Sequence, residues 1–258
     1  MFGVPNILLE KSDLMPILRD DTQFPSRVEQ PRPMAPGGML FHVLNRGAGR
    51  MRLFLKDGDF EAFERTIQKT LQTRPMRIIA YCLMSNHWHM VLWPERDGDL
   101  GSFMQKLTIT HARNWQVHRR RVGYGHLYQG RYKSFPIEDD EHFYQVVRYV
   151  ERNALRANLV GRAEDWRWSS HWQRIHGTAE SRQILSDWPL PRPTSWRRFV
   201  NQPQNDAELA AIRRSLQRGQ PYGRDAWTRV MAKRLGLEST LRGRGRPKKQ
   251  NDGDGSDN

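Results

Sequence analysis

The stretch Arg-Ile-Ile-Ala-Tyr-Cys-Leu-Met-Ser-Asn-His-Trp-His-Met-Val-Leu-Trp, residues 77–93, decides the fold of this chain. Its apolar runs, 77–84 and 87–93, contain the isoleucine, valine and aromatic residues that are typical of buried strands. Ser85 and Asn86 between the runs fit a tight turn. The sequence therefore predicts an antiparallel hairpin.

Further elements flank this hairpin on both sides. Residues 39–45 predict another buried strand, and 57–71 predict a helix that begins at an acidic stretch. A second helical stripe spans 100–115, residues 123–136 indicate a strand or hairpin, and acidic residues at 139–141 open a third helix. We therefore expect an α+β fold of the split β-α-β type, an antiparallel sheet with helices on one face.

The two ends of the chain differ from this core, which we expect over 34–172. Prolines without an apolar period predict a flexible arm over 1–33. A stretch rich in Trp and Pro, 173–204, is expected to act as a connector. Residues 205–249 predict a helical, basic extension, in which Asn205 caps a helix and Asp225–Leu235 forms another, followed by a disordered tail at 250–258.

The charge of the chain points to a polyanionic partner. Its 258 residues contain 42 Lys and Arg against 28 Asp and Glu, a net charge of +14. Nucleic acid is the usual partner of such a chain, and an anionic membrane surface is the alternative. Cys82 is the single cysteine, so an intramolecular disulfide is excluded. Without a long apolar run or a signal-like start, we expect a cytoplasmic, nucleoid-associated protein.

Two histidines in the hairpin form a candidate metal pair. Side chains alternate along a strand, so His87 and His89 share one face while Trp88 points to the other. Two imidazoles on one face could bind one divalent cation. The alternative is a pair of histidines on a half-exposed strand.

The third predicted helix carries a second group of polar side chains. Gln145, Tyr149 and Asn153 follow one another at helical spacing, beside a parallel stripe of Arg148, Arg152 and Arg156. The net charge favours phosphate contacts for the arginines, and a solvated face is the alternative. Tyr149 lies beside the apolar stripe, so it could equally be a tyrosine that flanks the core.

Together these groups suggest a reaction at a phosphodiester. A phenol has a pKa of about 10 and is a poor nucleophile at neutral pH, so Tyr149 needs assistance. A divalent cation held by His87 and His89, with an oxygen ligand from Asn153, could neutralise the phosphate and stabilise the leaving oxygen. The product would be a phosphotyrosine and a free hydroxyl.

At this point the sequence resembles the REP-associated tyrosine transposases of bacteria, members of the single-tyrosine HUH class. The similarity covers about residues 34–172 and resumes near 221–249. The matching segments are His42–Gly47, Met84–His89, Gly125–Ser134, Tyr149–Asn153 and Trp166–Ser170.

The resemblance implies a function and a set of site residues. Tyr149 would be the nucleophile, and His87, His89 and Asn153 would bind Mg²⁺ or Mn²⁺ on a ferredoxin-like core. The implied reaction is cleavage of single-stranded DNA beside repetitive palindromic hairpins through a 5′-phosphotyrosine. One position departs from the family, because Ala154 stands where proline often follows; alanine should keep the helix running.

Basic and aromatic residues outside this group are expected to contact DNA. They are Arg131, Tyr132, Lys133, Arg148, Arg152, Arg244, Arg246, Lys248 and Lys249. The last four lie in the basic run 242–249, whose Arg-Gly-Arg-Pro stretch resembles an AT-hook core, which enters a narrow minor groove. The alternative for that run is a solubilising tail.

Other interpretations of the sequence remain open. A non-cleaving protein of the same fold that binds a DNA or RNA hairpin would need neither Tyr149 nor the histidine pair. A metal-dependent phosphodiesterase that uses water would not need Tyr149. His111 and Cys82 are expected in the core, and Tyr144 is excluded from the face of Tyr149. The chain could act as a monomer or a homodimer.

Overall fold

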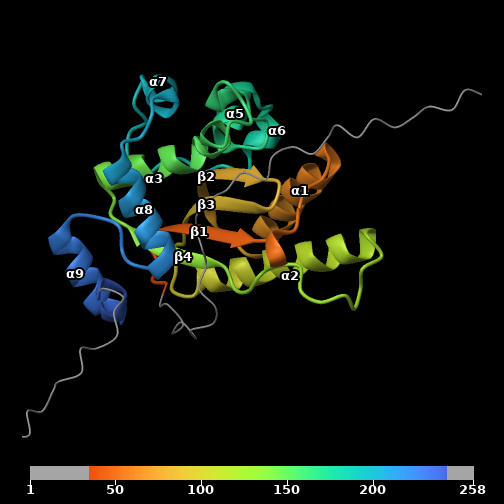
Figure 1. Ribbon diagram of the computed structural model, residues 1–258, viewed down its shortest axis with the longest axis horizontal. Helices are drawn as coiled ribbons and strands as arrows, with labels where there is room; N and C mark the ends of the chain where they lie inside the picture. Colours follow the sequence, from red (N-terminus) through yellow and green to blue (C-terminus); the bar gives the residue numbers. More distant parts are fainter. Residues whose placement is uncertain (1–34, 243–258) are drawn as a thin grey trace, which may run out of the picture.

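A four-stranded antiparallel sheet organises the computed structural model, which describes residues 35–242 (Figure 1). The strands are β1 (Leu40–Arg46), β2 (Arg77–Met84), β3 (His87–Trp93) and β4 (Lys133–Ile137). Their order across the sheet is β2-β3-β1-β4, and each neighbouring pair is antiparallel. This is the order of a ferredoxin-like split β-α-β core, so the predicted fold class is confirmed.

Helices follow the strands in the predicted order. They are α1 (Asp57–Thr73), α2 (Asp99–His118), α3 (Glu141–Glu151), α4 (Asn153–Arg156), α5 (Ser170–His176), α6 (Ala179–Arg182), α7 (Trp196–Asn201), α8 (Asp206–Arg218) and α9 (Asp225–Arg234). Three short 3₁₀ segments complete this part of the chain, at Ala48–Arg50, Ala163–Asp165 and Glu238–Leu241. The predicted N-cap of α8 is confirmed, because the Asn205 side chain accepts a hydrogen bond from the backbone N–H of Glu208.

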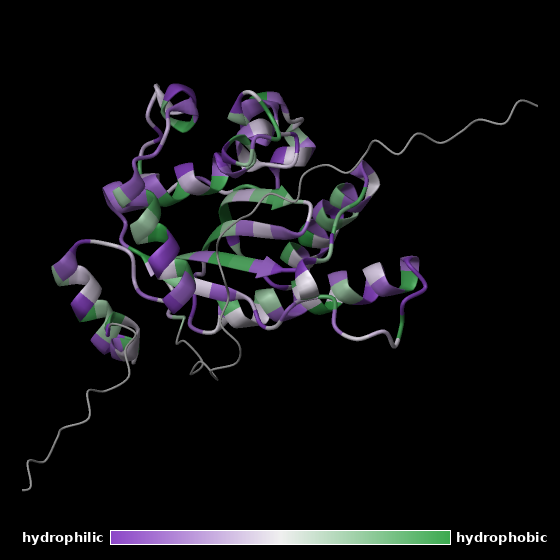
Figure 2. Ribbon diagram, viewed as in Figure 1, coloured by the Kyte–Doolittle hydropathy of each residue, from purple (hydrophilic) through white to green (hydrophobic). Residues whose placement is uncertain are grey.

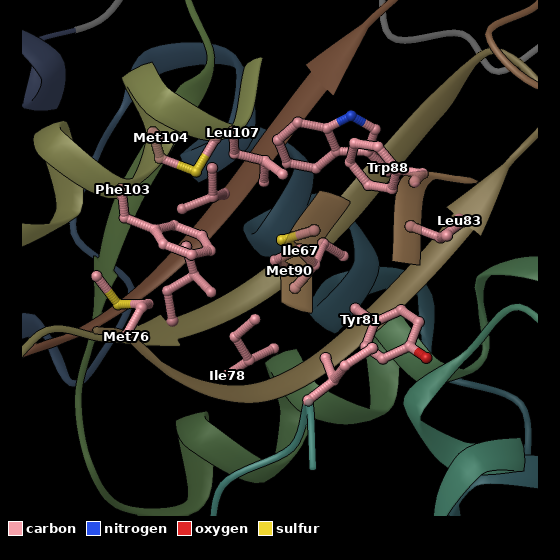
Figure 3. Close-up of a cluster of buried hydrophobic side chains, with 14 of the residues drawn as sticks. Ile67, Met76, Ile78, Tyr81, Leu83, Trp88, Met90, Phe103, Met104 and Leu107 are labelled. Carbon is pink, nitrogen blue, oxygen red and sulfur yellow. The ribbon is translucent and has the colours of Figure 1, made fainter. Parts of the chain in front are cut away.

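One face of the sheet packs against α1 and α2. Figure 3 shows this cluster, in which Trp88 and Met90 of β3 meet Ile67 of α1 and Phe103 of α2. All four side chains are fully buried. Burial of each large apolar side chain contributes about 1.5–3 kcal/mol, so this cluster holds both helices on the sheet. The prediction of helices on one face is correct for α1 and α2.

The opposite face is covered as well. Alternate residues of the same strands, such as Cys82 and Val91, pack against Val147 and Val150 of α3. Trp196 of α7 joins this second cluster, together with apolar residues of α8. In Figure 2 hydrophobic and hydrophilic residues alternate along the helices, whereas β2 is almost continuously hydrophobic. A strand with such a pattern is buried on both faces, which explains why the expectation of helices on one face only was incomplete.

The third predicted helix is interrupted near its end. Arg152 separates α3 from α4 with backbone angles of φ −84° and ψ −2°. Ala154 itself lies inside α4, as expected, so the interruption falls two residues before it. The hydrogen bond from Arg156 N to Arg152 O nevertheless carries the chain forward. Asn153 becomes the first residue of a short helix in place of a residue inside a long one.

Some predictions concern segments outside residues 35–242. The predicted arm at 1–33, the predicted tail at 250–258 and the basic run with Arg244, Arg246, Lys248 and Lys249 all lie outside the described residues. Within 35–242, no helix has both the length and the apolar composition that crossing a membrane requires.

Candidate active site

Strand β3 places the two predicted histidines on the face of the sheet that α3 covers. The ring centroids of His87 and His89 are 5.1 Å apart. Both side chains are buried, with exposed fractions of 6% and 2%. They therefore do not lie on a half-exposed strand, which was the alternative interpretation of the pair.

A third histidine, which was not predicted as a site residue, joins this pair. His42 of β1 lies on the same face, and its Nε2 is 2.9 Å from Nδ1 of His89. Nδ1 of His42 is buried without a hydrogen-bond partner in the described part of the chain. The sequence offered one signal for His42. It lies two residues from both Leu40 and Leu44, so the alternation of side chains along a strand places all three on one face. That signal does not reveal which neighbouring strand His42 approaches.

Burial keeps the imidazoles of His42 and His89 neutral. Desolvation lowers the pKa of His42 to about 3. Desolvation and the neighbouring His87 and His42 hold the pKa of His89 well below its usual range. A metal ion binds the neutral form of histidine through a nitrogen lone pair.

The hydrogen bonds of the pair also suit metal ligands. Nδ1 of His87 is 2.6 Å from Oδ1 of Asn86. Since an amide oxygen accepts, Nδ1 of His87 donates, and its Nε2 carries the lone pair. The same holds for His89 when its Nδ1 donates to His42. Fixing one ring nitrogen with a hydrogen bond is the usual support of a metal-bound histidine, so this donor set fits a divalent cation.

Helix α3 brings Tyr149 onto the histidines. Its ring packs edge-to-face on His89, with centroids 5.7 Å apart, and on His42 at 6.3 Å. The guanidinium of Arg156 lies over the same ring, 4.2 Å from its centre. Tyr149 is only 2% exposed, so the ring belongs to the second cluster and also faces the candidate metal pair.

The other two residues predicted on this surface have different surroundings. Asn153 is 3% exposed, and its Nδ2 has no hydrogen-bond partner within 35–242. A buried amide without a partner is a candidate for a ligand contact, so the role of Asn153 as a metal ligand stays a prediction. The side-chain oxygen of Gln145 accepts a hydrogen bond from the Tyr222 hydroxyl, which ties it to the C-terminal part of the chain.

Arg148 and Arg152 hold the C-terminal segment against α3. Arg148 donates to the carbonyls of Gln202 and Pro203 at 2.6 and 2.8 Å. Arg152 donates to the carbonyl of Asn201 at 2.7 Å. The alternative of a solvated face is wrong for Arg148, which is 6% exposed. Because these donors are used inside the protein, the geometry argues against the predicted phosphate contacts of both arginines.

A buried carboxylate lies two residues after Tyr149. Glu151 is fully buried and accepts hydrogen bonds from Ser170 Oγ and Trp196 Nε1, each at 2.7 Å. His171 Nδ1 is 3.2 Å from the same carboxylate. Burial alone raises the pKa of Glu151, but the hydrogen bonds from His171, Trp196 and Ser170 outweigh it and lower the pKa. Sequence reasoning missed this network because its members come from three separate helices.

A second group that could hold an ion lies at the other end of α3. Ligand atoms of Glu138, Asp140 and His142 all lie within 4.8 Å of one another. The side chain of Arg224 donates to Glu138 and lies 3.3 Å from Asp140, and the backbone N–H of Arg224 donates to Glu138 at 2.7 Å. Asp140 also caps α3 through the backbone N–H of His142. The Arg224 guanidinium therefore already offsets part of the negative charge of these carboxylates, which leaves the histidine pair as the better fit for a metal ion.

The remaining predicted DNA contacts within the described residues differ in how exposed their side chains are. Arg131 is exposed, and Tyr132 is half-buried against the first cluster. Lys133 begins β4, opposite Leu44 of β1. Their contact with DNA stays a prediction.

The predicted core residues are confirmed. His111 is 5% exposed, and its Nδ1 lies 2.5 Å from the Tyr128 hydroxyl. Cys82 is fully buried, and burial raises the pKa of its thiol to about 12.

A histidine pair on a ferredoxin-like sheet, faced by a tyrosine on a helix, is the arrangement of the single-tyrosine HUH class. Residues 37–153 match the family model described as "Transposase IS200 like". Residues 37–153 are therefore similar to the IS200-like transposases, and the predicted resemblance to REP-associated tyrosine transposases is confirmed.

Two known proteins are similar to parts of this chain. A protein of Haemophilus influenzae described as "Putative REP-associated tyrosine transposase" is 22% identical over 166 residues, which are 61% of this chain and 90% of the relative. A solved structure titled "Structure of the REP associates tyrosine transposase bound to a REP hairpin" is 21% identical. Its TM-score is 0.47, and the match covers 65% of this chain and 96% of that one.

Proposed function

We propose that this protein cleaves and rejoins single-stranded DNA beside repetitive palindromic hairpins through a 5′-phosphotyrosine intermediate. The IS200-like transposase match supports DNA processing as the activity. The name of the Haemophilus influenzae relative supports palindromic repeat DNA as the substrate. The net charge of +14 is consistent with a nucleic-acid partner.

The observation that carries this proposal is the contact between Tyr149 and His89. Sixty positions separate the two residues in the chain, yet their rings lie 5.7 Å apart on the buried face of the sheet. A protein that only binds DNA needs no tyrosine against a pair of buried histidines. A strand transferase with a phenol nucleophile needs both the tyrosine and a cation site beside it, because the weak nucleophile and the charged phosphate have to be brought together.

In the proposed reaction the Tyr149 oxygen attacks the phosphorus of a phosphodiester. A bond forms between that oxygen and phosphorus, and the bond between phosphorus and the 3′ oxygen breaks. The departing oxygen takes up a proton and leaves as a 3′ hydroxyl, while the phenol proton passes to water. Arg156 brings a positive charge beside the reacting side chain. Attack by a 3′ hydroxyl on the phosphotyrosine reverses these steps and joins strands.

His87 and His89 would hold the divalent cation, Mg²⁺ or Mn²⁺, with Asn153 as a further ligand. When bound, the ion supplies charge neutralisation at the phosphate and stabilises the leaving oxygen. Asn86 and His42 orient the two imidazoles through contacts with Nδ1 of His87 and Nδ1 of His89, respectively. Imidazole and amide ligands accept several divalent metals, so the choice between Mg²⁺ and Mn²⁺ is left to experiment.

One observation favours the alternative of a hairpin-binding protein that does not cut. Tyr149 is 2% exposed, so a scissile phosphate reaches its oxygen only if the surrounding side chains move. In the alternative, the same fold recognises a hairpin, and Tyr149 acts as a core residue.

Covalent capture separates these functions. The full chain is mixed with single-stranded hairpins labelled at either end, in Mg²⁺ or Mn²⁺ and in EDTA. The matched control is Tyr144→Phe, because Tyr144 lies on the same helix and donates its hydroxyl to the Pro191 carbonyl. We expect a metal-dependent, denaturant-resistant adduct with the wild type and Tyr144→Phe, and none with Tyr149→Phe.

The other outcomes are equally informative. Cleavage that survives in Tyr149→Phe supports a phosphodiesterase that uses water. Tight binding to hairpins with no adduct in either metal supports the protein that binds without cutting. The label that stays on the protein gives the polarity of attack, and a 3′-phosphotyrosine would contradict the polarity proposed above.

We also propose that successive segments of the chain have separate roles. Residues 34–172 form the catalytic domain, 173–204 connect it to the extension, and 205–249 extend the DNA contact. Arg131, Tyr132 and Lys133 would contact the DNA next to the domain, and Arg244, Arg246, Lys248 and Lys249 would add contacts from the extension. The connector also has a structural role, because Trp196 packs in the second cluster and donates to Glu151.

A further inference from the structure

The loop between α2 and β4 presents a large aromatic ring to solvent. Every residue from Arg120 to His126 is exposed. Tyr124 is 75% exposed and Val122 is 66% exposed, the highest values among the exposed large hydrophobic residues of the described chain. Figure 1 shows this loop beyond the C-terminal end of α2, at the right edge of the molecule.

The loop is nevertheless fixed by hydrogen bonds. The Gln116 side chain donates to the carbonyl of Gly125 at 2.8 Å. The backbone N–H of Arg121 donates to Gln116, and that of Tyr124 donates to Arg121. Gly125 has a positive φ of 91°, a conformation that glycine adopts without strain. The ring of Tyr124 is therefore presented at a defined place.

A buried tyrosine anchors the base of the loop. Tyr128 is 8% exposed, and its hydroxyl contacts His111 Nδ1 at 2.5 Å and Trp88 Nε1 at 3.3 Å. Trp88 lies between the two histidines of the candidate metal pair, on the opposite face of β3. The anchor of the loop thus rests on the strand that carries the candidate metal ligands.

Backbone hydrogen bonds bring the base of the loop close to the site. Ala48 donates to the Leu127 carbonyl at 2.9 Å, just after β1 ends. Gly47 donates to the Asn86 carbonyl at 2.9 Å. The side chain of Asn86 contacts His87. A strand of DNA that reaches the proposed site therefore passes near this end of the sheet.

The charge around the ring is positive. Residues 119–133 contain four arginines and one lysine and no acidic residue. The guanidinium of Arg121 lies 5.6 Å from the centre of the Tyr124 ring. Arg119 differs from the others because it pairs with Asp59. A phosphate backbone complements this surface, and an aromatic ring among cations is the usual surface for an unpaired base.

We propose that Tyr124 is a stacking platform for one unpaired base of the bound DNA strand. The inference rests on the proposed function, because it needs a single-stranded nucleic acid at this end of the sheet. Arg121, whose guanidinium lies over the Tyr124 ring, would hold the phosphate beside the stacked base. The ring would recognise the presence of an unpaired base and not its identity, since each base offers a π face.

The test compares binding of fluorescent hairpins with single-stranded flanks by the full chain, measured in EDTA so that the DNA stays intact. We expect Tyr124→Ala to weaken binding by about 5- to 150-fold, the range that loss of one stacked base produces. Tyr124→Phe keeps the ring and should bind as the wild type does. Val122→Ala is the matched control, since it removes exposed apolar surface from the same loop without a π face.

A second readout locates the stacked base. Each unpaired position of the hairpin is replaced in turn by 2-aminopurine, whose fluorescence is quenched on stacking. We expect quenching at one position with the wild type and Tyr124→Phe, and its loss with Tyr124→Ala. The proposal is overturned if Tyr124→Ala binds as Val122→Ala does, or if it preserves the quenching pattern.

Covalent capture with the same protein preparations distinguishes failure of the stacking proposal from failure of the proposed function. If the wild type forms the Tyr149 adduct and Tyr124→Ala binds normally, the stacking platform is refuted and the proposed function stands. If the wild type binds no single-stranded DNA, both are refuted.

Discussion

Glu151→Gln tests whether the buried carboxylate holds the tyrosine helix in place. Wild-type Glu151 accepts hydrogen bonds from Ser170 and Trp196 and lies 3.2 Å from His171. Glutamine has nearly the same shape but offers one acceptor oxygen and one amide donor. With donors on several sides, the new amide N–H₂ has to face at least one of them.

The expected loss follows from these contacts. A hydrogen bond to a charged group contributes about 1.5–3 kcal/mol, and a buried donor left without an acceptor costs about 1–3 kcal/mol. Breaking a buried ion pair costs about 3–5 kcal/mol, which sets the upper limit. We therefore expect Glu151→Gln to lower the free energy of unfolding by about 2–4 kcal/mol, a large share of the 5–15 kcal/mol typical of a domain.

Urea unfolding followed by tryptophan fluorescence measures this loss. For a slope near 2 kcal/mol per M, the midpoint should fall by roughly 1–2 M. Glu61→Gln is the control, because Glu61 is a helical glutamate whose exposed ion pairs with Arg65 and Arg167 are 3.8 and 3.6 Å long. Exposed pairs of this kind contribute about 0–1 kcal/mol. The reasoning is refuted if the two variants unfold at the same urea concentration.

The same network predicts a pH dependence with a defined sign. The hydrogen bonds lower the pKa of Glu151 in the folded protein below its usual value of 4.5. Its stabilising contribution is therefore complete above that value and is lost as the pH falls toward the lowered pKa. The difference in stability between the wild type and Glu151→Gln should shrink on acidification. A difference that grows as the pH falls would contradict this assignment.

The further predictions concern the two candidate metal sites and the arginines expected at the DNA or inside the protein. His42→Phe removes the partner of His89 and should weaken Mn²⁺ binding about 10- to 100-fold in calorimetry, as loss of a supporting hydrogen bond does; unchanged affinity would exclude His42 from the metal site. Arg224→Ala frees the carboxylates whose charge it partly offsets, so Mn²⁺ should raise the melting temperature of this variant through a site that the wild type lacks. Equal shifts in both proteins would show that Arg224 does not block an ion. Arg131→Gln should weaken hairpin binding and lower the slope of log affinity against log salt by about 0.7–0.9. Arg148→Gln should instead reduce thermal stability and leave that slope unchanged, and the reverse pattern would restore Arg148 as a phosphate contact.

The local sequence pattern was sufficient to predict the central hairpin and the first residues of several helices. The predicted strands at 77–84 and 87–93 have the same bounds as β2 and β3. The helices predicted to begin at Asp57 and Asp225, and the one capped by Asn205, also begin where expected. In each case the signal lies within a few residues, as an apolar run ended by a turn, an acidic first turn or a cap.

The alternation of a strand also determined which side chains share a face. His87 and His89 lie together, and Trp88 lies in the opposite cluster. The period of two in the side chains is a property of the backbone, so it needs no information about neighbouring strands.

Contacts between distant segments were decided by tertiary structure alone. The pairing of β1 with β3 brings His42 to His89, and no local signal gives that pairing. The interruption at Arg152 accompanies hydrogen bonds to a segment almost fifty residues later.

By itself, the sequence determined the ferredoxin-like order of elements, the shared face of the histidine pair and the candidate tyrosine. Tertiary structure decided that α3 covers the second face, that Arg148 and Arg152 hold the C-terminal segment, and that Glu151 is buried among three donors. The physical reason is that backbone periodicity and capping act over a few residues. The partner of a charged or polar side chain depends on which remote surface packs against it.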